Sequence, residues 1–186
     1  MINGQTVLAV IPARGGSKRI PRKNLQLWKG KTLVHWAVDS ARESVYLDGF
    51  CVSSEDKDIL EHASDLGAVT CRRPEWLATD KATSEGVLVH ALYTWKWAEW
   101  IVLLQPTSPQ RTGEDIDECI KRAQLGNGCA TFNEYGQRNG AVYVARSEYM
   151  IANIKFLVET FEQFLIMPNG RSLDIDYPQD LAGHAA

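Results

Sequence analysis

The amino-acid sequence predicts an α/β fold: a mostly parallel, twisted sheet with helices on both faces, arranged in three layers. Two observations carry this prediction. Apolar runs typical of buried strands alternate along the chain with segments whose apolar residues recur at helical spacing. The 186 residues, 45% hydrophobic and 23% charged, also match one globular domain with a sizeable core, so we expect a single domain over residues 1–186.

The expected elements follow one another in a regular order. The first strand is the continuous apolar run TVLAVIPA, residues 6–13, and a helix with an apolar stripe follows at 32–44. GFCVSS, residues 49–54, predicts a second strand, and Ser54 is placed to cap a helix that ends at Gly67. The remaining expected elements are a short strand at 68–74, a helix at 83–97, a strand at 100–106, a helix at 113–128, and strands at 139–146 and 172–177.

Composition argues against several classes of partner. Lys and Arg number 20 against 23 Asp and Glu, a net charge of -3, so a broad basic face for nucleic acid is not expected. No apolar run approaches the roughly 18 residues of a membrane span, so no membrane partner is expected either. The chain shows no export signal and its four cysteines are far apart, which favours reduced thiols and a cytoplasmic location.

The positive charge is concentrated in one loop, VIPARGGSKRIPRKN, residues 10–24. Its five cations surround Gly15 and Gly16 and follow the first strand, at the sheet edge where ligands bind in such folds. Glycine lets the backbone approach an anion, and the cations can contact phosphate oxygens. The spacing fits neither the P-loop nor the dinucleotide fingerprint. A small phosphate-bearing ligand is therefore the favoured interpretation, and a solvated basic turn is the alternative.

A second candidate site lies in SLDIDY, residues 172–177. Alternate residues of a strand share a face, so Asp174 and Asp176 are expected to point the same way, opposite Leu173 and Ile175. Neighbouring carboxylates repel unless a cation stabilises them, and Mg²⁺ binds one or two carboxylates together with phosphates. Beside a phosphate loop this pattern predicts a Mg²⁺ site. The alternative is the polar face of an edge strand.

Several motifs in order resemble those of the CMP-N-acetylneuraminate synthetases, the acylneuraminate cytidylyltransferase family. They are IPARGGSKRIPRKN, RRPEWLATDKATSEGVLVHAL, LLQPTSPQRT, RNGAVYV, MIAN and SLDID. The resemblance implies a Rossmann-like nucleotidyltransferase fold. It also implies a reaction in which the anomeric hydroxyl of a nine-carbon sugar acid attacks the α-phosphate of CTP in line, with Mg²⁺ as cofactor, giving CMP-sugar and pyrophosphate.

The resemblance also assigns roles to residues at the matching positions. Nucleotide binding falls to Arg14, Gly15, Gly16, Ser17, Lys18, Lys23, Asn24, Arg73, Ala82 (through its backbone) and Ser84. Sugar binding falls to Gln105, Arg138, Asn139, Tyr143 and Phe156. The expected catalytic residues are Lys18, Lys23, Arg111, Asp174 and Asp176, the last two also binding the metal. Simpler roles stand beside these: Arg73 as a surface cation, Gln105 as a loop residue, Tyr143 and Phe156 as core aromatics, and Asp80 as a helix cap.

The chain departs from the family's pattern at one place. The family usually has several tens of residues before its NGA motif, a segment that forms a dimer arm and adds basic residues to the partner's sugar pocket. Here GCATFNEYGQRNGAVYV passes almost directly from one strand to the next, which leaves homodimerisation open. Arg138 is expected to replace part of the missing charge. Two alternatives therefore remain: transfer to another sugar acid or from another nucleotide, and a degenerate relative that binds nucleotide without turnover.

Overall fold

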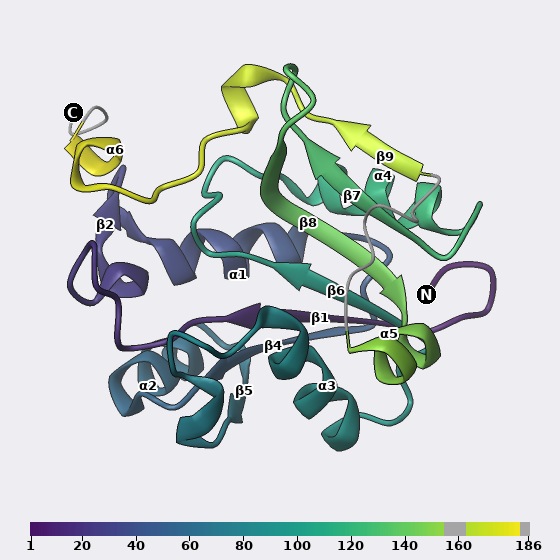
Figure 1. Cartoon of the computed structure of the whole chain (residues 1–186), viewed down its shortest axis with the longest axis horizontal. Coiled ribbons are helices and arrows are strands. Elements are labelled where there is room, and N and C mark those ends of the chain that lie inside the picture. The colour runs from purple at the N-terminus through teal and green to yellow at the C-terminus, as the bar shows by residue number, and fades with distance from the viewer. Residues whose placement is uncertain (155–162, 183–186) are drawn as a thin grey trace.

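The computed structural model describes residues 1–154 and 163–182 of the chain. A seven-stranded sheet crosses the molecule in the order β5-β4-β1-β6-β8-β7-β9 (Figure 1). Its strands are β1 (Val7–Pro12), β4 (Gly49–Ser54), β5 (Val69–Arg72), β6 (Trp100–Leu104), β7 (Gly128–Phe132), β8 (Arg138–Arg146) and β9 (Gln163–Ile166). Neighbouring strands are parallel except that β8 runs antiparallel to both β6 and β7. The expected mostly parallel α/β sheet is confirmed.

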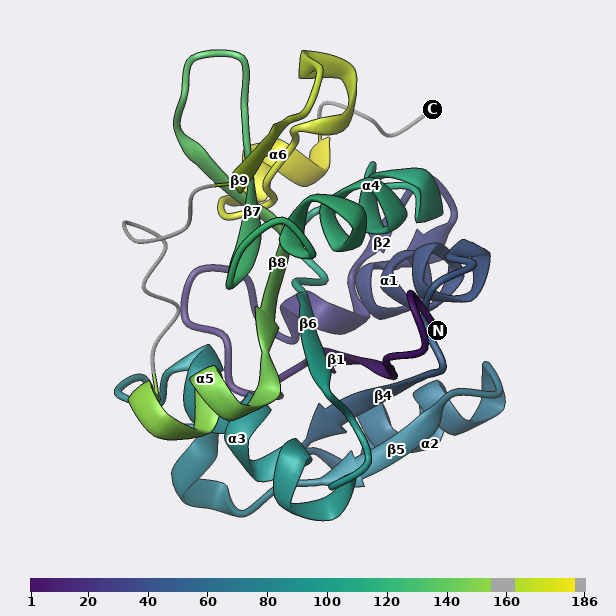
Figure 2. The ribbon, with the colours of Figure 1, turned by 90° about the vertical axis from the view of Figure 1, so that its right-hand side faces the viewer.

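Helices cover both faces of this sheet (Figure 2). One face carries α1 (Leu33–Glu43), α2 (Lys57–Asp65) and α4 (Gly113–Ala123), and the other carries α3 (Ser84–Thr94) and α5 (Ser147–Asn153). Strand β1 shows how the sequence divides between the layers, because successive strand residues point to opposite faces. Val7, Ala9 and Ile11 join the core under α1, α2 and α4, whereas Leu8 and Val10 join the core under α3 and α5.

Several shorter elements complete the fold. They are the 3₁₀ turns η1 (Lys23–Leu25), η2 (Glu75–Leu77) and η4 (Asn169–Arg171), the ribbon of β2 (Leu27–Trp28) and β3 (Lys31–Thr32), and α6 (Pro178–Ala182). A third apolar cluster joins the basic loop to the C-terminal segment, since Ile20, Trp28, Leu33 and Ile175 pack together and each is buried. This cluster keeps the segment that carries Asp174 and Asp176 beside the basic loop.

Three sequence-based expectations about local structure are wrong. Residues 172–177 form no strand: the segment is not paired with the sheet, and the Ile175 N–H donates to the carbonyl of Thr107, in the loop after β6, at 2.8 Å. Helix α2 is capped by Asp56 and not by Ser54, which ends strand β4. Asp80 caps no helix, because Thr83 is the N-cap of α3.

The topology brings many loops to one edge of the sheet. Strands β1, β4, β5 and β6 all end there because they are parallel, and β8 begins there because it runs the other way. From β1 the chain passes to β4 on one side, whereas β6, which comes later in the chain, pairs with β1 on its other side. The strand order therefore reverses at β1, and α/β sheets bind ligands at such a switch point. None of the helices in the part of the chain that the structure describes combines the length and hydrophobicity of a membrane span.

Candidate functional site

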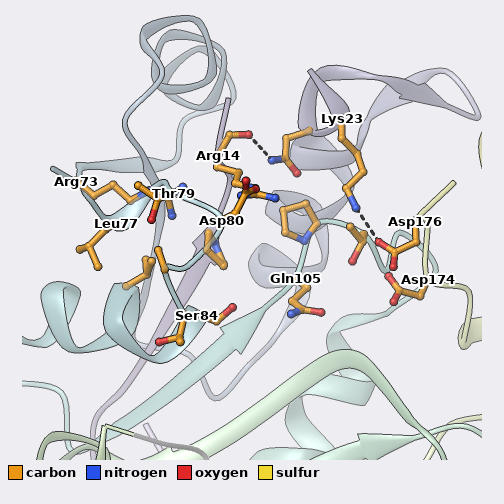
Figure 3. A pocket seen from close by; sticks show the side chains of 17 residues that line it. Arg14, Lys23, Arg73, Leu77, Thr79, Asp80, Ser84, Gln105, Asp174 and Asp176 are labelled. Atoms are coloured by element: carbon orange, nitrogen blue, oxygen red, sulfur yellow. Dashed lines mark hydrogen bonds and ion pairs between the residues drawn. The ribbon is translucent and has the colours of Figure 1, made fainter. Parts of the chain in front are cut away.

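A cavity of about 440 Å³ opens at this edge of the sheet. Figure 3 shows Arg14, Arg73, Thr79 and Asp80 on one side of the cavity. Lys23, Asp174 and Asp176 lie on the opposite side, with Gln105 between the two groups. A second cavity of about 350 Å³ adjoins the first, and Arg14, Lys23, Asn24, Asp80 and Asp176 line both. The two distant sequence motifs therefore meet in one hollow.

The cations of the first half of the basic loop are paired with Asp80. Arg14 Nη1 lies 2.9 Å from Asp80 Oδ1, and Lys18 Nζ lies 2.5 Å from Asp80 Oδ2. The hydrogen bonds from Lys18 and Arg14 lower the pKa of Asp80. Ser17 lines the second cavity, and open space surrounds the position that a side chain would take at Gly16. These cations face the cavity but are paired with a carboxylate of the chain itself.

The second half of the loop is paired in the same way with Asp176. Lys23 Nζ lies 3.0 Å from Asp176 Oδ1, and Arg19 Nη1 lies 2.7 Å from Asp176 Oδ2. Burial alone would raise the pKa of Asp176, but the hydrogen bonds and charges of Lys23 and Arg19 outweigh it and lower that pKa. Asp174 forms no ion pair with Lys or Arg in the described ranges, and desolvation within the cavity raises its pKa.

The backbone of the basic loop is held by side chains of Glu55 and Asn24. The Gly15 N–H donates to Glu55 Oε1 at 2.7 Å, and a side chain at Gly15 would overlap with Asp56. Asn24, which is buried, donates from Nδ2 to the Arg14 carbonyl at 2.9 Å. The Gly15 N–H therefore already has an acceptor within the protein, and the binding of an anion at Gly15 remains a prediction.

Another part of the cavity lining comes from the segment between β5 and α3. Arg73 lines the cavity yet its side chain is 3% exposed, and its Nε and Nη2 donate to Glu55 Oε2 at 3.1 and 2.9 Å. Burial lowers the pKa of Arg73, and the charge of Glu55 partly offsets this. Arg73 is thus no ordinary surface cation. Ser84, the first residue of α3, and Ala82 also line the cavity, although the Ala82 N–H is bonded to a turn carbonyl.

Gln105 follows β6 and lines the cavity, but Arg111 lies behind it. The Arg111 side chain is buried, and its Nη1 donates to the carbonyls of Gln105 at 3.0 Å and Ala141 at 2.8 Å. Its Nε and Nη2 donate to Ser40 Oγ. Burial lowers the pKa of Arg111 to about 9, with Asp115 partly offsetting it. The structure does not bring Arg111 into the cavity. Instead, Arg111 supports the backbone of Gln105 through the hydrogen bond to its carbonyl.

The structure also keeps Asn139 away from the cavity lining. Its Oδ1 accepts from Thr131 Oγ1 at 2.7 Å and its Nδ2 donates to Ser172 Oγ at 3.4 Å, so the amide ties β7 and β8 to the C-terminal segment. Tyr143 is half-buried beyond the cavity lining, and burial raises its pKa. Arg138 is exposed at the start of β8. Phe156 lies outside the described residues. Their sugar-binding roles remain predictions.

Comparisons with known proteins agree with this geometry. A sequence profile described as cytidylyltransferase matches residues 8–152, most of the chain. The chain belongs to the cytidylyltransferase family. It is 29% identical to the CMP-N,N'-diacetyllegionaminic acid synthase of Legionella pneumophila, over 95% of this chain and 93% of the relative. It is 37% identical to the N-acylneuraminate cytidylyltransferase of Escherichia coli, over 63% of this chain but 28% of that longer protein. The resemblance read from the motifs is thereby confirmed.

Solved structures support the fold of this cytidylyltransferase. The structure of a CMP:2-keto-3-deoxy-manno-octonic acid synthetase complexed with CTP superposes with a TM-score of 0.78 over 96% of both chains, at 14% identity. That identity shows the fold alone. The alignment with the Legionella relative spans 216 positions, more than the 186 residues of this chain, so the relative carries residues that the chain lacks. A short β7–β8 hairpin, closed by the Asn133 N–H donating to the Gln137 carbonyl at 2.8 Å, agrees with the expected short connection.

Sequence reasoning missed Glu55 and Gly140 and gave Asp80 no pairing role. Strand pairing offers a signal for Glu55, because Ser54 of β4 pairs with Arg72 of β5. The residues that follow the two strands are Glu55 and Arg73, so the parallel pairing places an acid beside a base. Gly140 has a positive φ of 73°, and a side chain there would overlap with Gln105 Oε1. No local pattern predicts that contact, since it joins β8 to the loop after β6.

Proposed function

We propose that this cytidylyltransferase transfers CMP from CTP to a nonulosonic acid of the sialic type and releases pyrophosphate. The observation that supports this most is that four loop cations and the carboxylates of Asp80 and Asp176 surround two adjoining cavities, one of which is also lined by a buried arginine, Arg73. The cations can bind the oxygens of the triphosphate, and the planar guanidinium of Arg73 can contact the nucleoside. The relatives named above act, by their names, on legionaminic and neuraminic acids, which supports an acceptor of that class.

In the proposed reaction the anomeric hydroxyl of the acid attacks the α-phosphorus. A new O–P bond forms as the bond between the α-phosphorus and its bridging oxygen breaks, and pyrophosphate leaves with the electron pair. Arg14 and Lys18 would exchange Asp80 for phosphate oxygens, and Lys23 would exchange Asp176 in the same way. Fixed cations at a developing pyrophosphate stabilise the transition state. Gln105, held by Arg111, would orient the acceptor.

The two aspartates fit a Mg²⁺ ion that also takes phosphate and water ligands. In the described ranges no group of three or more His, Cys, Asp and Glu side chains could hold a metal, which argues against a closed cage of protein ligands. Asp174 and Asp176 both line the cavity and supply the one or two carboxylates that Mg²⁺ usually receives from a protein. When bound there, Mg²⁺ would neutralise the triphosphate. Asp174 lines the cavity and is also proposed as a candidate base for the acceptor hydroxyl.

The short β7–β8 hairpin favours one competing function. A chain without the usual segment before Gly140 loses basic residues expected near the acceptor carboxylate, each charged hydrogen bond being worth roughly 1.5–3 kcal/mol. A protein that binds nucleotide without transferring it is the resulting alternative.

Pyrophosphate release decides between the two functions. The assay combines the protein with Mg²⁺, one nucleotide (CTP, UTP or GTP) and one acid from a nonulosonic panel, with acid-free and EDTA controls. We expect release with CTP and at least one acid, and none in either control. CTP binding by calorimetry without release for any acid would support the binding protein and contradict the transferase.

Substitution of Asp80 tests whether the chain's own carboxylate competes with phosphate. Asp80→Asn should strengthen binding of metal-free inorganic tripolyphosphate by roughly two- to five-fold, because Arg14 and Lys18 lose an exposed ion-pair partner. Isothermal calorimetry in EDTA measures this effect. The matched control is Asp58→Asn, which breaks the 2.8 Å pair with Arg22 outside both cavities and should leave binding unchanged. Weaker binding by Asp80→Asn would contradict the competition.

A further inference from the structure

Glu55 connects two parts of the cavity lining, the basic loop and the segment after β5, without lining the cavity itself. Its Oε1 accepts the Gly15 N–H of the basic loop at 2.7 Å. Its Oε2 accepts hydrogen bonds from Nε and Nη2 of Arg73, which follows β5, at 3.1 and 2.9 Å. The side chain of Glu55 is 10% exposed and that of Arg73 is 3% exposed. One buried carboxylate therefore fixes a backbone group on the phosphate side and a guanidinium on the nucleoside side.

The surroundings of Glu55 leave it little freedom to exchange partners. It follows β4 directly, and the pairing of Ser54 with Arg72 fixes its position beside Arg73. Gly15 packs so closely on the next residue, Asp56, that a side chain at Gly15 would overlap with it. Unpaired, a buried guanidinium or carboxylate would be strongly destabilising, so both charges stay together. The ion pairs of Asp80 and Asp176 differ from that of Glu55, because both aspartates line the cavity. Their cations can therefore exchange the carboxylate for a ligand.

The pairing also defines what Arg73 can offer a ligand. Nε and one Nη2 hydrogen are used on Glu55, and no described residue bonds Nη1. A guanidinium held along one edge presents its other edge in a fixed direction, because the group is planar. Arg73 lines the cavity, so the donors not used on Glu55 are the ones it would offer to a ligand there.

We propose that Glu55 is a positioning residue that sets the spacing between the nucleoside wall and the phosphate loop, so that both halves of one nucleotide bind at once. This rests on the proposed function, in which the ligand is CTP. Binding both halves of a ligand on preset groups avoids the free energy of ordering them separately. Glu55 would act through Gly15 and Arg73 and would touch neither the nucleotide nor the acceptor.

The substitution Glu55→Gln tests the proposal at constant shape. The amide has one oxygen, so either Gly15 or Arg73 must face its NH₂ group, donor against donor. The expected result is CTP binding at least about tenfold weaker, as loss of one charged hydrogen bond implies. Tripolyphosphate alone and cytidine alone, each of which uses one wall, should weaken less than CTP. Calorimetry without acceptor measures all three, so no turnover is needed.

Two further variants separate positioning from a purely structural role. Glu55→Asp keeps the charge but, one methylene shorter, cannot reach both partners, so it should bind CTP more weakly than the parent and more tightly than Glu55→Gln. Glu118→Gln is the matched control, because Glu118 accepts from Arg122 Nε at 2.8 Å on the exposed side of α4. It should leave all three affinities unchanged.

The outcomes distinguish this proposal from the proposed function. Parent-like CTP affinity in folded Glu55→Gln or Glu55→Asp overturns the positioning role, even if urea titration shows lost stability. Equal weakening of CTP and of the two fragments also overturns it, since the walls would then not be coupled. A parent that binds none of the three ligands overturns both proposals. A Glu55→Gln that fails to fold leaves the decision to Glu55→Asp, whose CTP affinity must fall.

Discussion

Asp176→Asn should bind metal-free CTP more tightly than the parent and yet lose transfer in Mg²⁺ by about 100-fold or more. The gain follows from the ion pairs. Asp176 holds Lys23 Nζ at 3.0 Å and Arg19 Nη1 at 2.7 Å, and a neutral amide releases both cations for phosphate oxygens. The Asp176 side chain is 42% exposed, so we expect a gain of roughly two- to five-fold, as for partly solvated pairs. The loss follows because one of two proposed Mg²⁺ ligands disappears.

Calorimetry with CTP in EDTA and pyrophosphate release in Mg²⁺ measure the two effects. Asp174→Asn is the matched control, since in the described ranges no Lys or Arg forms an ion pair with Asp174. It should reduce transfer to a similar extent while leaving metal-free CTP binding close to that of the parent. A Mg²⁺ titration of Asp176→Asn that overlays the parent's would contradict the metal site. Weaker metal-free binding would contradict the exchange of cations between carboxylate and phosphate.

The fold was accessible from the sequence because its signals are local. The apolar run before Arg14, the helical spacing after Thr32 and the glycine-rich loop each specify an element within a few residues. Parallel pairing then brings the loops after those strands to one edge. The basic loop and the aspartate motif could thus be expected near a ligand. Their direct pairing, Lys23 with Asp176, depends on the buried cluster around Ile175.

The roles of Arg111 and Asn139 were harder to predict from the sequence, because the side chains of arginine and asparagine can form hydrogen bonds either with a ligand or with buried groups of the protein. The sequence suggests that Arg111 contacts phosphate or the acceptor. In the structure its Nη1 donates instead to the backbone carbonyls of Gln105 and Ala141. Asn139 likewise turns inward to Thr131. Strand register and burial decide such cases, and neither is visible in a motif. Both side chains lie outside the cavity lining.

Gly140 shows the same dependence on tertiary structure, and its replacement is expected to be damaging. Gly140→Ala places a methyl group where Gln105 Oε1 now lies, and the φ of 73° is left-handed, a conformation that costs an L side chain about 1–2 kcal/mol. Gln105 must therefore move, and a displaced positioning group can reduce transfer about 100-fold. Pyrophosphate release under saturating CTP, with varied acceptor, measures the loss.

A matched glycine separates strain from displacement. Gly136, in the β7–β8 hairpin, has the same φ of 73° but nothing within 4 Å of the added methyl group. Gly136→Ala and Gly140→Ala should therefore lose similar free energies of unfolding in urea, whereas only Gly140→Ala should lose transfer. Equal transfer by the two variants would show that the place of Gln105 is unimportant. In a Gln105→Ala background the added effect of Gly140→Ala on transfer should vanish and its effect on stability remain, because the overlapping amide is gone.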